Sequence, residues 1–587
     1  MAYFIYPSAF DVIVVGGGHA GCEAALASAG MGMRTLLMTQ DLDTIAQMSC
    51  NPSIGGLGKG QIVRELDALG GRMGRVADLS MLSAHMLNTS RGPAVRAPRA
   101  QCDKKLYQAA MKLALERADN LAVIQDEAES LWTEGSALKG VTTVRRTRYE
   151  ARTVVLTTGT FLKGLIHIGQ VSLRGGRYNH PPSDGLSPSL EALGFRLGRL
   201  KTGTPMRLNG RTIDLSKCSE QPPDDPPPLF SRFSVRPERK LLSCWITRTG
   251  PGSSAVINEN LHRSPLYSGR IKSSGPRYCP SIEDKIVKFP HNPDHIIFLE
   301  PEGFDTEEYY VNGLSTSLPE EVQLELLRSV RGLEKARMIR AAYAIEYDFC
   351  PPDQLRLSLE TRNVPGLFMA GQINGTTGYE EAAAQGLIAG INAARLVKGE
   401  EPLVLGRDEA YIGVMIDDLV SKGVDEPYRM FTARAEYRLL LRQDNADLRL
   451  MDRGLDLGLV PAVFRRNFER YKAAVERARK GGKPASEEAD MAPWTSEEAE
   501  TCARIGKEYS TYIDRAVRDA SGMKDFERIR IPETMDPSGI KGLSAESSQR
   551  FRRVRPVTLA QAARIPGVTP ADIQLLLVHL ARLGGKD

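Results

Sequence analysis

The sequence predicts an α/β protein, with a Rossmann-type dinucleotide-binding domain, an inserted α+β domain and an all-α C-terminal domain. Three observations support this prediction. A strand, a glycine-rich turn and a helix open the chain, two later segments repeat the strand-and-turn character, and charged segments with helical periodicity follow residue 401. The chain has 587 residues, too many for one hydrophobic core, so several domains are expected.

The first βαβ unit contains the glycine pattern G-x-G-x-x-G. The apolar run Phe10–Val15 predicts a buried parallel strand, and Arg34–Met38 predicts the next one. Between them, Gly16 permits a tight turn, Gly18 lets a pyrophosphate approach the backbone, and Gly21 lets helix and strand pack closely. A dinucleotide site is therefore predicted at this turn.

One part of the dinucleotide pattern is missing at the end of the second strand. The acidic residue that usually holds a ribose is replaced there by Thr39 and Gln40, and Asp41 lies just beyond. The sequence leaves the ribose contact open between these side chains.

Two later segments predict that the first domain is interrupted and then resumed. Thr153–Phe161 is a strand that runs into a glycine turn, and Gly366–Ala394 is a strand, a glycine-rich turn and a long helix of small residues. Both are typical of late strands in a Rossmann-type FAD-binding domain. The long helix can direct its N-terminus at the flavin, or its small residues can serve close helix packing alone.

These patterns divide the chain into three predicted domains. Residues 1–200 and 345–400 form the discontinuous Rossmann-type domain, 201–344 form the inserted domain, and 401–587 form the helical domain. The proline-dense loop that begins at Gln221 predicts a cap on a sheet edge or a join between substructures. Near the C-terminus, Thr558 with Gln561 predicts a capping box, and Thr569 before Pro570 predicts a second helix start.

Composition narrows the functional classes. No apolar run approaches the roughly 20 residues that span a bilayer, and the N-terminus lacks a secretory signal, so a cytoplasmic protein is expected. Eight cysteines are scattered singly, which suggests neither a disulfide framework nor a zinc site. Between Arg429 and Lys483 there are 14 Lys and Arg against 7 Asp and Glu, a local excess of 14 − 7 = +7. This segment either follows a polyanion or forms an ion-paired helix surface.

Two cysteines have local contexts that suggest chemistry. Cys279 precedes Pro280, so we expect it to cap a helix whose dipole, with Arg277, would stabilise a thiolate. Such a thiolate can attack C6 of a pyrimidine and activate C5. Cys50 lies in the turn-forming context SCNPS, where a small buried hydrophobic role is the alternative.

Two further motifs are less specific. Gly55–Gly60 fails as a phosphate-binding P-loop, because Ser53 stands at the leading glycine position and Gly60 at the hydroxyl position, so a backbone loop near a flavin or substrate is expected. Arg91, Arg96 and Arg99 either hold an anion or form an exposed basic loop.

Taken together, several long motifs resemble the MnmG (GidA) family of tRNA uridine 5-carboxymethylaminomethyl modification enzymes. The resemblance runs from about residue 8 to the C-terminal helices, and its motifs are GGGHAGCEAA, MSCNPSIGGLGKG, GPAVRAPRAQ, GPRYCPSIEDK, FLEPEG, AIEYDF, AGQINGTTGYEEAAAQG and EPYRMFTARAEYRLLLRQDNADLRL.

The resemblance implies an FAD enzyme that is usually a homodimer and works with the GTPase MnmE. It implies that the pair builds an aminomethyl or carboxymethylaminomethyl group on C5 of the wobble uridine of certain tRNAs. Methylenetetrahydrofolate would supply one carbon, ammonium or glycine the nitrogen, and NADH would reduce the flavin. The inserted domain would bind NAD and substrate, and the helical domain would contact tRNA and the GTPase.

The resemblance also assigns residues. It implies Cys50 and Cys279 as the functional cysteines, with Cys279 as the uridine-directed thiol and Cys50 as its partner. The implied FAD contacts are Gly16, Gly17, Gly18, His19, Ala20, Gly21, Ala128, Ser183 and Gln372. The implied nicotinamide contacts fall in the run from Gly275 to Phe289, namely Gly275, Pro276, Arg277, Tyr278, Glu283, Asp284, Lys285 and Phe289.

Three alternatives remain at this stage. A folate- and FAD-dependent tRNA (uracil-5-)-methyltransferase shares the flavin fold but lacks a long helical C-terminal domain, so the residues beyond Gly406 argue against it. A flavin disulfide or small-molecule oxidoreductase is disfavoured by the missing C-x-x-C motif and the arginine-rich tail. A noncatalytic flavin-bearing adaptor for a GTPase would tolerate serine at both Cys50 and Cys279.

Overall fold

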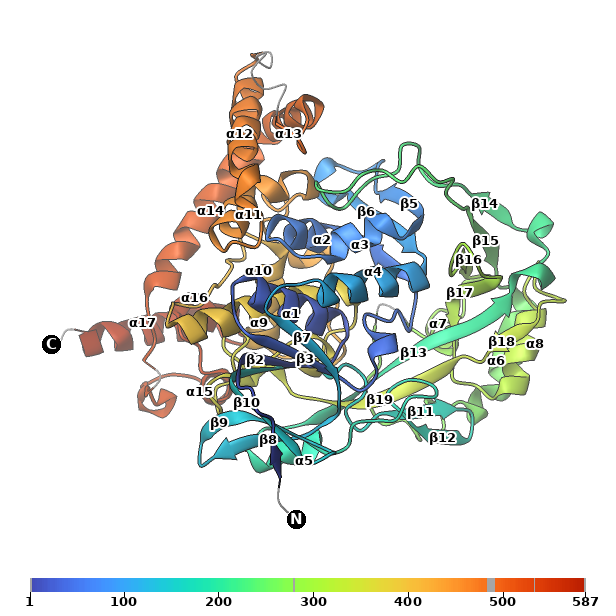
Figure 1. Cartoon of the computed structure of the whole chain (residues 1–587), viewed down its shortest axis with the longest axis horizontal. Helices are drawn as coiled ribbons and strands as arrows, with labels where there is room; N and C mark the ends of the chain where they lie inside the picture. Colours follow the sequence, from blue (N-terminus) through green and yellow to red (C-terminus); the bar gives the residue numbers. More distant parts are fainter. Residues whose placement is uncertain (1–2, 278–279, 483–490, 533, 585–587) are drawn as a thin grey trace.

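The computed structural model describes residues 3–277, 280–482, 491–532 and 534–584. Two large sheets form the body of the molecule, and helices from the last third of the chain lie along one side of it (Figure 1). The strands β14–β18 lie on the opposite side from these helices (Figure 1). None of the helices in the described ranges is both long enough and apolar enough to cross a membrane.

The first sheet has eight strands and a parallel centre. Its main order is β7-β3-β2-β10-β9-β8, and β1 and β20 pair with β10. The predicted βαβ unit is confirmed, because β2 and β3 are parallel and α1 (His19–Gly30) connects them. The strands are β1 (Phe4–Ile5), β2 (Phe10–Val15), β3 (Thr35–Thr39), β7 (Leu121–Gln125), β8 (Ala128–Glu134), β9 (Ala137–Thr143), β10 (Thr147–Leu156) and β20 (Leu367–Met369).

The long helix α9 (Tyr379–Lys398) packs directly on α1. A Cβ at Gly386 would lie 2.0 Å from the carbonyl oxygen of Ala20, and a Cβ at Gly390 would lie 2.3 Å from that of Ala24. Real side chains do not tolerate such distances, so these two glycines let the helix backbones touch. The predicted tight packing of the small-residue helix is confirmed, and it ties the resumed part of the first domain to its beginning.

The second sheet has nine strands, all paired antiparallel. Its order is β12-β11-β19-β13-β17-β16-β15-β14, with β18 on β13. The strands are β11 (Leu165–Ile168), β12 (Val171–Arg174), β13 (Gly198–Asn209), β14 (Ser219–Gln221), β15 (Cys244–Arg248), β16 (Ile296–Pro301), β17 (Glu308–Ser315), β18 (Met338–Arg340) and β19 (Tyr343–Phe349). The helices α6 (Pro251–Asn260), α7 (Ile282–Lys288) and α8 (Glu320–Arg328) share a separate hydrophobic core with it. The domain boundaries as such stay a prediction.

A third, small sheet lies beside the dinucleotide fold. It contains β4 (Ser53–Gly55), β5 (Met81–Leu87) and β6 (Ala97–Cys102) in the order β4-β6-β5. The helices α2 (Lys59–Ala68), α3 (Met73–Leu79) and α4 (Lys104–Glu116) accompany it, and α5 (Leu186–Ala192) packs on β8. This substructure carries the segment that contains Cys50.

The proline-dense loop between β14 and β15 joins distant parts of the chain, as predicted. Phe230 is fully buried, and the Asp78 carboxylate accepts hydrogen bonds from the backbone N–H groups of Phe230 and Ser231. Arg232, next in the loop, forms ion pairs with Asp447 and Glu498 in the helical part. The loop thus connects the second sheet, α3 and the C-terminal helices.

Within the residues that the structure describes, the chain after residue 401 forms helices and no strands. Glu65 of α2 fixes the first of them, because its carboxylate accepts the backbone N–H groups of Tyr411 and Ile412. The longer helices are α10 (Tyr411–Lys422), α11 (Ala446–Asp456), α12 (Arg465–Arg479), α13 (Ser496–Glu508), α14 (Ser510–Arg528), α15 (Ala545–Val554), α16 (Leu559–Arg564) and α17 (Pro570–Gly584).

Both predicted helix starts near the C-terminus are present. Thr558 accepts a hydrogen bond from the N–H of Gln561, but the Gln561 side chain accepts from Val557 rather than from Thr558, so the predicted reciprocal box is shifted by one residue. Thr569 accepts from the N–H of Asp572. The apolar residues of α17 pack mainly within the chain, because Ile573, Leu576 and Leu580 join a core with α15 and α16.

Candidate active site

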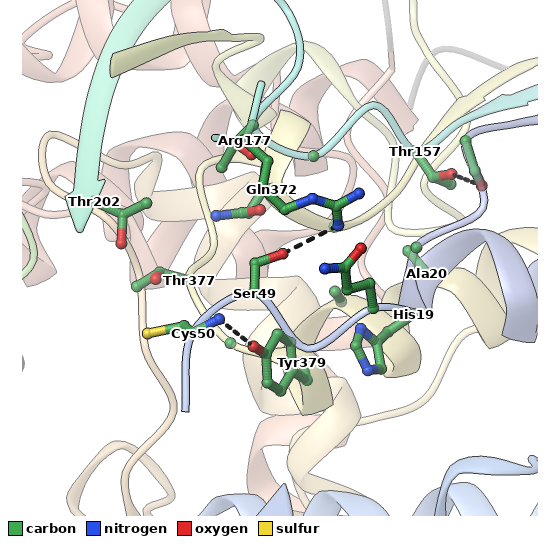
Figure 2. Close-up of a pocket in the computed structure, with 18 of the residues that line it drawn as sticks. His19, Ala20, Ser49, Cys50, Thr157, Arg177, Thr202, Gln372, Thr377 and Tyr379 are labelled. Atoms are coloured by element: carbon green, nitrogen blue, oxygen red, sulfur yellow. Dashed lines mark hydrogen bonds between the residues drawn. The ribbon is translucent and has the colours of Figure 1, made fainter. Parts of the chain in front are cut away.

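A cavity of about 780 Å³ lies where the three parts of the chain meet. The carboxyl ends of β2, β3 and β10 form one wall, which is where open α/β sheets bind ligands. Strands β13 and β17 of the second sheet form another, and the segment from Arg429 to Phe431 closes part of it from the helical side. Figure 2 shows residues from these walls facing a common space.

The glycine loop has the geometry that the sequence predicts. Gly16 has a φ of +108°, and a Cβ at Gly21 would lie 1.7 Å from the carbonyl oxygen of Gly16. The hydroxyl of Thr157 donates to the carbonyl oxygens of Val15 and Gly16 and so fixes the turn. Figure 2 shows Thr157 with one of these bonds. A Cβ at Gly18, in contrast, would meet nothing within 4 Å. The loop is rigid on one side and open to the cavity on the other.

Polar groups without partners line the same space. Gly18 is the N-cap of α1 and offers no side-chain hydrogen bond, so the positive end of the helix dipole meets the cavity. Among the described residues, neither Thr158 Oγ1 nor His19 Nε2 has a hydrogen-bond partner. Burial lowers the pKa of His19 to about 4, against the opposing effect of Glu380, so the ring is neutral. This open, donor-bearing cradle fits the pyrophosphate of a dinucleotide.

The acidic side chains near the expected ribose position come from a strand that the sequence analysis did not identify. Strand β7 pairs in parallel with β3, and Asp126 and Glu127 follow it. Both line the cavity beside Gln40 and Asp41. Burial raises the pKa of Glu127. The apolar run LAVIQ, followed directly by two acids, is the signal that could have revealed them.

Cys50 lies at the junction between the dinucleotide fold and the second sheet. Its backbone N–H donates to the hydroxyl of Tyr379 over 2.8 Å (Figure 2). Its Sγ lies 3.1 Å from the hydroxyl oxygen of Tyr310 and 3.6 Å from the carbonyl oxygen of Gly203. Cys50 is half-buried and lines the cavity, so the residue can meet a ligand there. The prediction that Cys50 is simply a buried hydrophobe does not fit this position.

Two arginines hold the segment that contains Cys50. Arg207 Nη2 donates to the carbonyl oxygen of Ser49 over 3.0 Å, and its guanidinium also pairs with the buried Glu302. Arg177 Nη1 donates to Ser49 Oγ over 3.2 Å (Figure 2). The thiol therefore has a fixed position relative to the glycine loop.

Comparison with known proteins places this arrangement in a family. A model described as "Glucose inhibited division protein A" matches residues 11–401, and a model of the "tRNA modifying enzyme MnmG/GidA C-terminal helical bundle" matches residues 519–586. The chain belongs to the MnmG/GidA family. The match to the C-terminal bundle also argues against the methyltransferase alternative, which lacks such a domain.

Relatives resemble the chain over nearly its whole length. It is 50% identical over 609 residues to a protein from Protochlamydia amoebophila, which covers 99% of this chain and 97% of that one. It is 51% identical over 620 residues to a protein from Geobacter sulfurreducens, with 98% of each covered. Both are named tRNA uridine 5-carboxymethylaminomethyl modification enzyme MnmG.

The fold agrees with solved structures of the family. The form II crystal structure of Aquifex aeolicus GidA has a TM-score of 0.91 and 46% identity, and covers 98% of this chain and 99% of that one. The form I crystal gives a TM-score of 0.88 with 48% identity, over 98% and 100% of the chains. The predicted fold class, with an FAD-binding Rossmann-type domain, an inserted domain and a helical C-terminal domain, is confirmed.

The FAD contacts implied by the GidA resemblance gather at the cavity. Its lining includes Gly16, Gly17, Gly18, His19, Ala20, Ala128, Ser183 and Gln372. Gly21 follows the lining residue Ala20 in α1 and acts through packing against the turn. The lining residues come from the turn after β2, from α1 and β8, from the segment before α5 and from the turn after β20. The structure thus brings one set together from widely separated segments.

The implied nicotinamide contacts do not gather in the same way. Pro276 lines the cavity, whereas Arg277 pairs with Glu426 at 3.2 Å and Phe289 is 55% exposed. Glu283 is buried and accepts a hydrogen bond from Thr316. The remaining described members are Gly275, which packs against Lys201, Asp284, which accepts from Tyr267, and Lys285, which donates to Gly313.

The predicted helix cap at Cys279 is wrong. Helix α7 begins at Ile282, and Ser281 is its N-cap, accepting from the N–H of Asp284. A serine hydroxyl accepts a hydrogen bond from the unpaired backbone N–H groups of a first helical turn better than a thiol does, so the helix starts two residues later than expected. Tyr278 and Cys279 themselves lie outside the described residues.

The GGLGKG segment is not a phosphate loop. Lys59 Nζ lies 2.7 Å from Glu380 and 3.2 Å from Glu381, and both carboxylates are buried. Burial by itself opposes ionisation of Glu380, but the Lys59 ammonium outweighs it and lowers the pKa. Glu381 also accepts the backbone N–H of Met430. The lysine is thus used to join this loop, α9 and the helical part.

Many arginines in the basic segment after residue 429 are held in ion pairs. The pairs are Arg442 with Asp444, Arg449 with Glu65, Arg453 with Glu409, Arg465 with Asp456, and Lys472 with Asp452. For these residues the ion-paired surface is the correct alternative. Of the three arginines in the segment RGPAVRAPRAQ, Arg99 lies in β6 and pairs with Glu300 over 2.7 Å. Arg96, just before β6, donates to the carbonyl oxygen of Thr89.

Proposed function

We propose that this chain is an FAD-dependent tRNA-modifying enzyme that builds an aminomethyl or carboxymethylaminomethyl group on C5 of wobble uridine. One observation carries the proposal: the half-buried Cys50 lines the same cavity as the glycine loop of the dinucleotide fold. The names of relatives about half identical over the whole chain support the substrate.

The chain's residues have distinct tasks in this proposal. The loop from Gly16 to Gly21, with Ala128, Ser183 and Gln372, would hold FAD, which when bound supplies hydride transfer. Cys279 would add to C6 of uracil: the new S–C6 bond pushes an electron pair to the carbonyl oxygen at C4 and makes C5 nucleophilic. After C5 has been substituted, its proton leaves and the thiolate is expelled. Cys50 acts as the partner thiol.

The co-substrates and partners rest on the family resemblance. NADH would reduce the flavin, methylenetetrahydrofolate would supply one carbon, and ammonium or glycine the nitrogen. The run from Gly275 to Phe289 would contact the nicotinamide, although its described residues are dispersed. The GTPase MnmE would bind as a partner of a homodimer in the cytoplasm, and the helical domain would contact the tRNA.

Mass spectrometry of tRNA nucleosides tests the proposal. A strain that lacks the gene should lose the C5-aminomethyl uridines, and the wild-type gene should restore them. Cys50→Ser and Cys279→Ser should each fail to restore them while the purified variants keep bound FAD. Loss of 5-methyluridine instead would support a methyltransferase, and full restoration by both variants would support a noncatalytic adaptor.

A further inference from the structure

We propose that Tyr310 is a positioning residue whose hydroxyl donates a hydrogen bond to Cys50 Sγ and so stabilises the thiolate when it forms. Only the role of this contact in a reaction rests on the proposed function; the contact itself is present in the structure. The Tyr310 hydroxyl oxygen lies 3.1 Å from Cys50 Sγ, and Tyr310 is 3% exposed on strand β17. The second sheet thereby contacts the thiol of the first domain directly.

The two polar neighbours of the sulfur favour opposite protonation states. The carbonyl oxygen of Gly203, 3.6 Å away, can only accept a hydrogen bond, so it favours the neutral thiol. The phenol of Tyr310 can donate, and a hydrogen bond to the charged form of an acid favours that form. A phenol keeps its proton until about pH 10. Because a phenol is ordinarily a weaker acid than a thiol, the phenol is the donor once the thiol has lost its proton.

The charges around the pair strengthen this donor. The Arg207 guanidinium lies over the Tyr310 ring, 4.7 Å from its centroid, and so stabilises negative charge that develops on the phenol oxygen. Glu302 opposes this effect because it pairs with Arg207 over 3.0 Å. Arg177 approaches from the other side through Ser49 Oγ.

Among the described residues, the Glu300 carboxylate and two other phenols lie near the segment that contains Cys50; Glu300 accepts from Asn51 Nδ2 over 2.8 Å and pairs with Arg99. Tyr379 on α9 accepts the N–H of Cys50 and does not contact Sγ. Tyr343 on β19 lines the same cavity wall, and burial raises its pKa, so it is neutral. The short contact thus distinguishes Tyr310 from the other two tyrosines of the wall.

The functional consequence is a larger nucleophilic fraction of Cys50 near neutral pH. A thiolate and not a thiol reacts with carbon electrophiles and exchanges with other sulfurs. The proton that leaves the thiol goes to solvent, and no oxidant or reductant is needed. This contribution is useful to Cys50 whichever bond it makes in the reaction.

The test is the pH profile of Cys50 alkylation by iodoacetamide, in which the S–C bond forms as iodide leaves. Mass spectrometry of the Cys50 peptide in the full chain gives its rate separately from the other cysteines. Tyr310→Phe should raise the midpoint of this profile by about one unit, since a hydrogen bond to a charged group is lost. The rate one unit below the original midpoint should fall about ten-fold.

Two comparisons make the result decisive. Tyr343→Phe removes a phenol from the same wall and should leave the midpoint unchanged. Replacement of Tyr310 by 4-aminophenylalanine keeps the shape but weakens the donor and does not ionise in this range, so it should also raise the midpoint even if Tyr310→Phe does not fold. The proposal would be overturned if the midpoint stayed unchanged in both variants at position 310, or if Tyr343→Phe shifted it by the same amount.

The alkylation assay needs no tRNA, so it separates this inference from the proposed function. If Cys50→Ser abolishes uridine modification while Tyr310→Phe leaves the alkylation midpoint unchanged, the proposed function stands and the role of Tyr310 is refuted. If Tyr310 shifts the midpoint but no modified uridine depends on the gene, the contact stands and the proposed function is refuted.

Discussion

Two glycines of the dinucleotide loop should fail in opposite ways when replaced by alanine. At Gly21 a Cβ would lie 1.7 Å from the carbonyl oxygen of Gly16 and 2.8 Å from Thr157 Oγ1, so α1 or the turn must move. At Gly18 a Cβ would meet nothing within 4 Å and would project into the cavity. Gly21→Ala should therefore destabilise the fold, and Gly18→Ala should obstruct the ligand.

The sizes of the two effects can be worked out separately. Overpacking typically costs about 1–3 kcal/mol, and the higher helix propensity of alanine returns up to about 1 kcal/mol. The contact at Gly21 is with backbone, which cannot rotate away, so a net loss of about 2 kcal/mol is expected. At about 2–4 °C per kcal/mol for a large domain, the Tm falls by about 4–8 °C.

The assay is thermal unfolding of flavin-free protein, followed by titration with FAD. Gly21→Ala should lower the Tm of the flavin-free protein. Gly18→Ala should leave this Tm near the wild-type value but weaken the binding of FAD at least ten-fold. Its Tm should then rise less on addition of FAD, because ligand stabilisation depends on concentration relative to Kd. An unchanged Tm for Gly21→Ala, or wild-type affinity in Gly18→Ala, would refute this account of the loop.

Three more predictions follow from buried or cavity-lining carboxylates. Glu65→Ala should lower the free energy of unfolding by about 3–5 kcal/mol in urea, because it removes the buried carboxylate that pairs with Arg449 and accepts the N–H groups of Tyr411 and Ile412; Arg449→Met, which keeps those N–H contacts, should cost less. Burial opposes ionisation of Glu346, but hydrogen bonds from His167 and Ser273 lower its pKa to about 2. The ionised carboxylate therefore stabilises the folded protein fully above about pH 4.5, and this stabilisation is lost as the pH falls toward 2. Glu346→Gln should flatten that part of an acid-unfolding curve. Glu127→Gln should weaken FAD binding several-fold in fluorescence titration, whereas the exposed Glu129→Gln should not.

The parts of the site that the sequence predicts correctly are those encoded in one short segment. The glycine loop needs Gly16 and Gly21 for reasons of local geometry, and the same is true of the small residues that let α9 touch α1. The cap at Cys279 was wrong although it is also local, because Ser281 is a second candidate two residues away and its hydroxyl is the stronger acceptor.

The parts that the sequence does not reveal are contacts between segments that folding brings together. The acids near the ribose position follow β7, which becomes a neighbour of β3 only through the order of strands in the sheet. Tyr310 lies 260 residues from Cys50 in the chain, and nothing near either residue indicates the other. The sequence does not show which acids pair with the arginines after residue 429, because partners such as Glu65 for Arg449 are far away in the chain.

The same long-range contacts explain how the helical part can influence the cavity. Glu381 links Lys59 of the GGLGKG segment to the backbone of Met430, and a Cβ at Gly58 would lie 2.9 Å from Cα of Phe431. Any displacement of the Arg429–Phe431 segment must therefore move a cavity wall or break a buried ion pair. A macromolecule bound to the helices would act on the cavity through this connection. Lys59→Met combined with Glu380→Gln and Glu381→Gln removes all three charges of this cluster at similar volumes, so it should uncouple the two without removing the glycine loop.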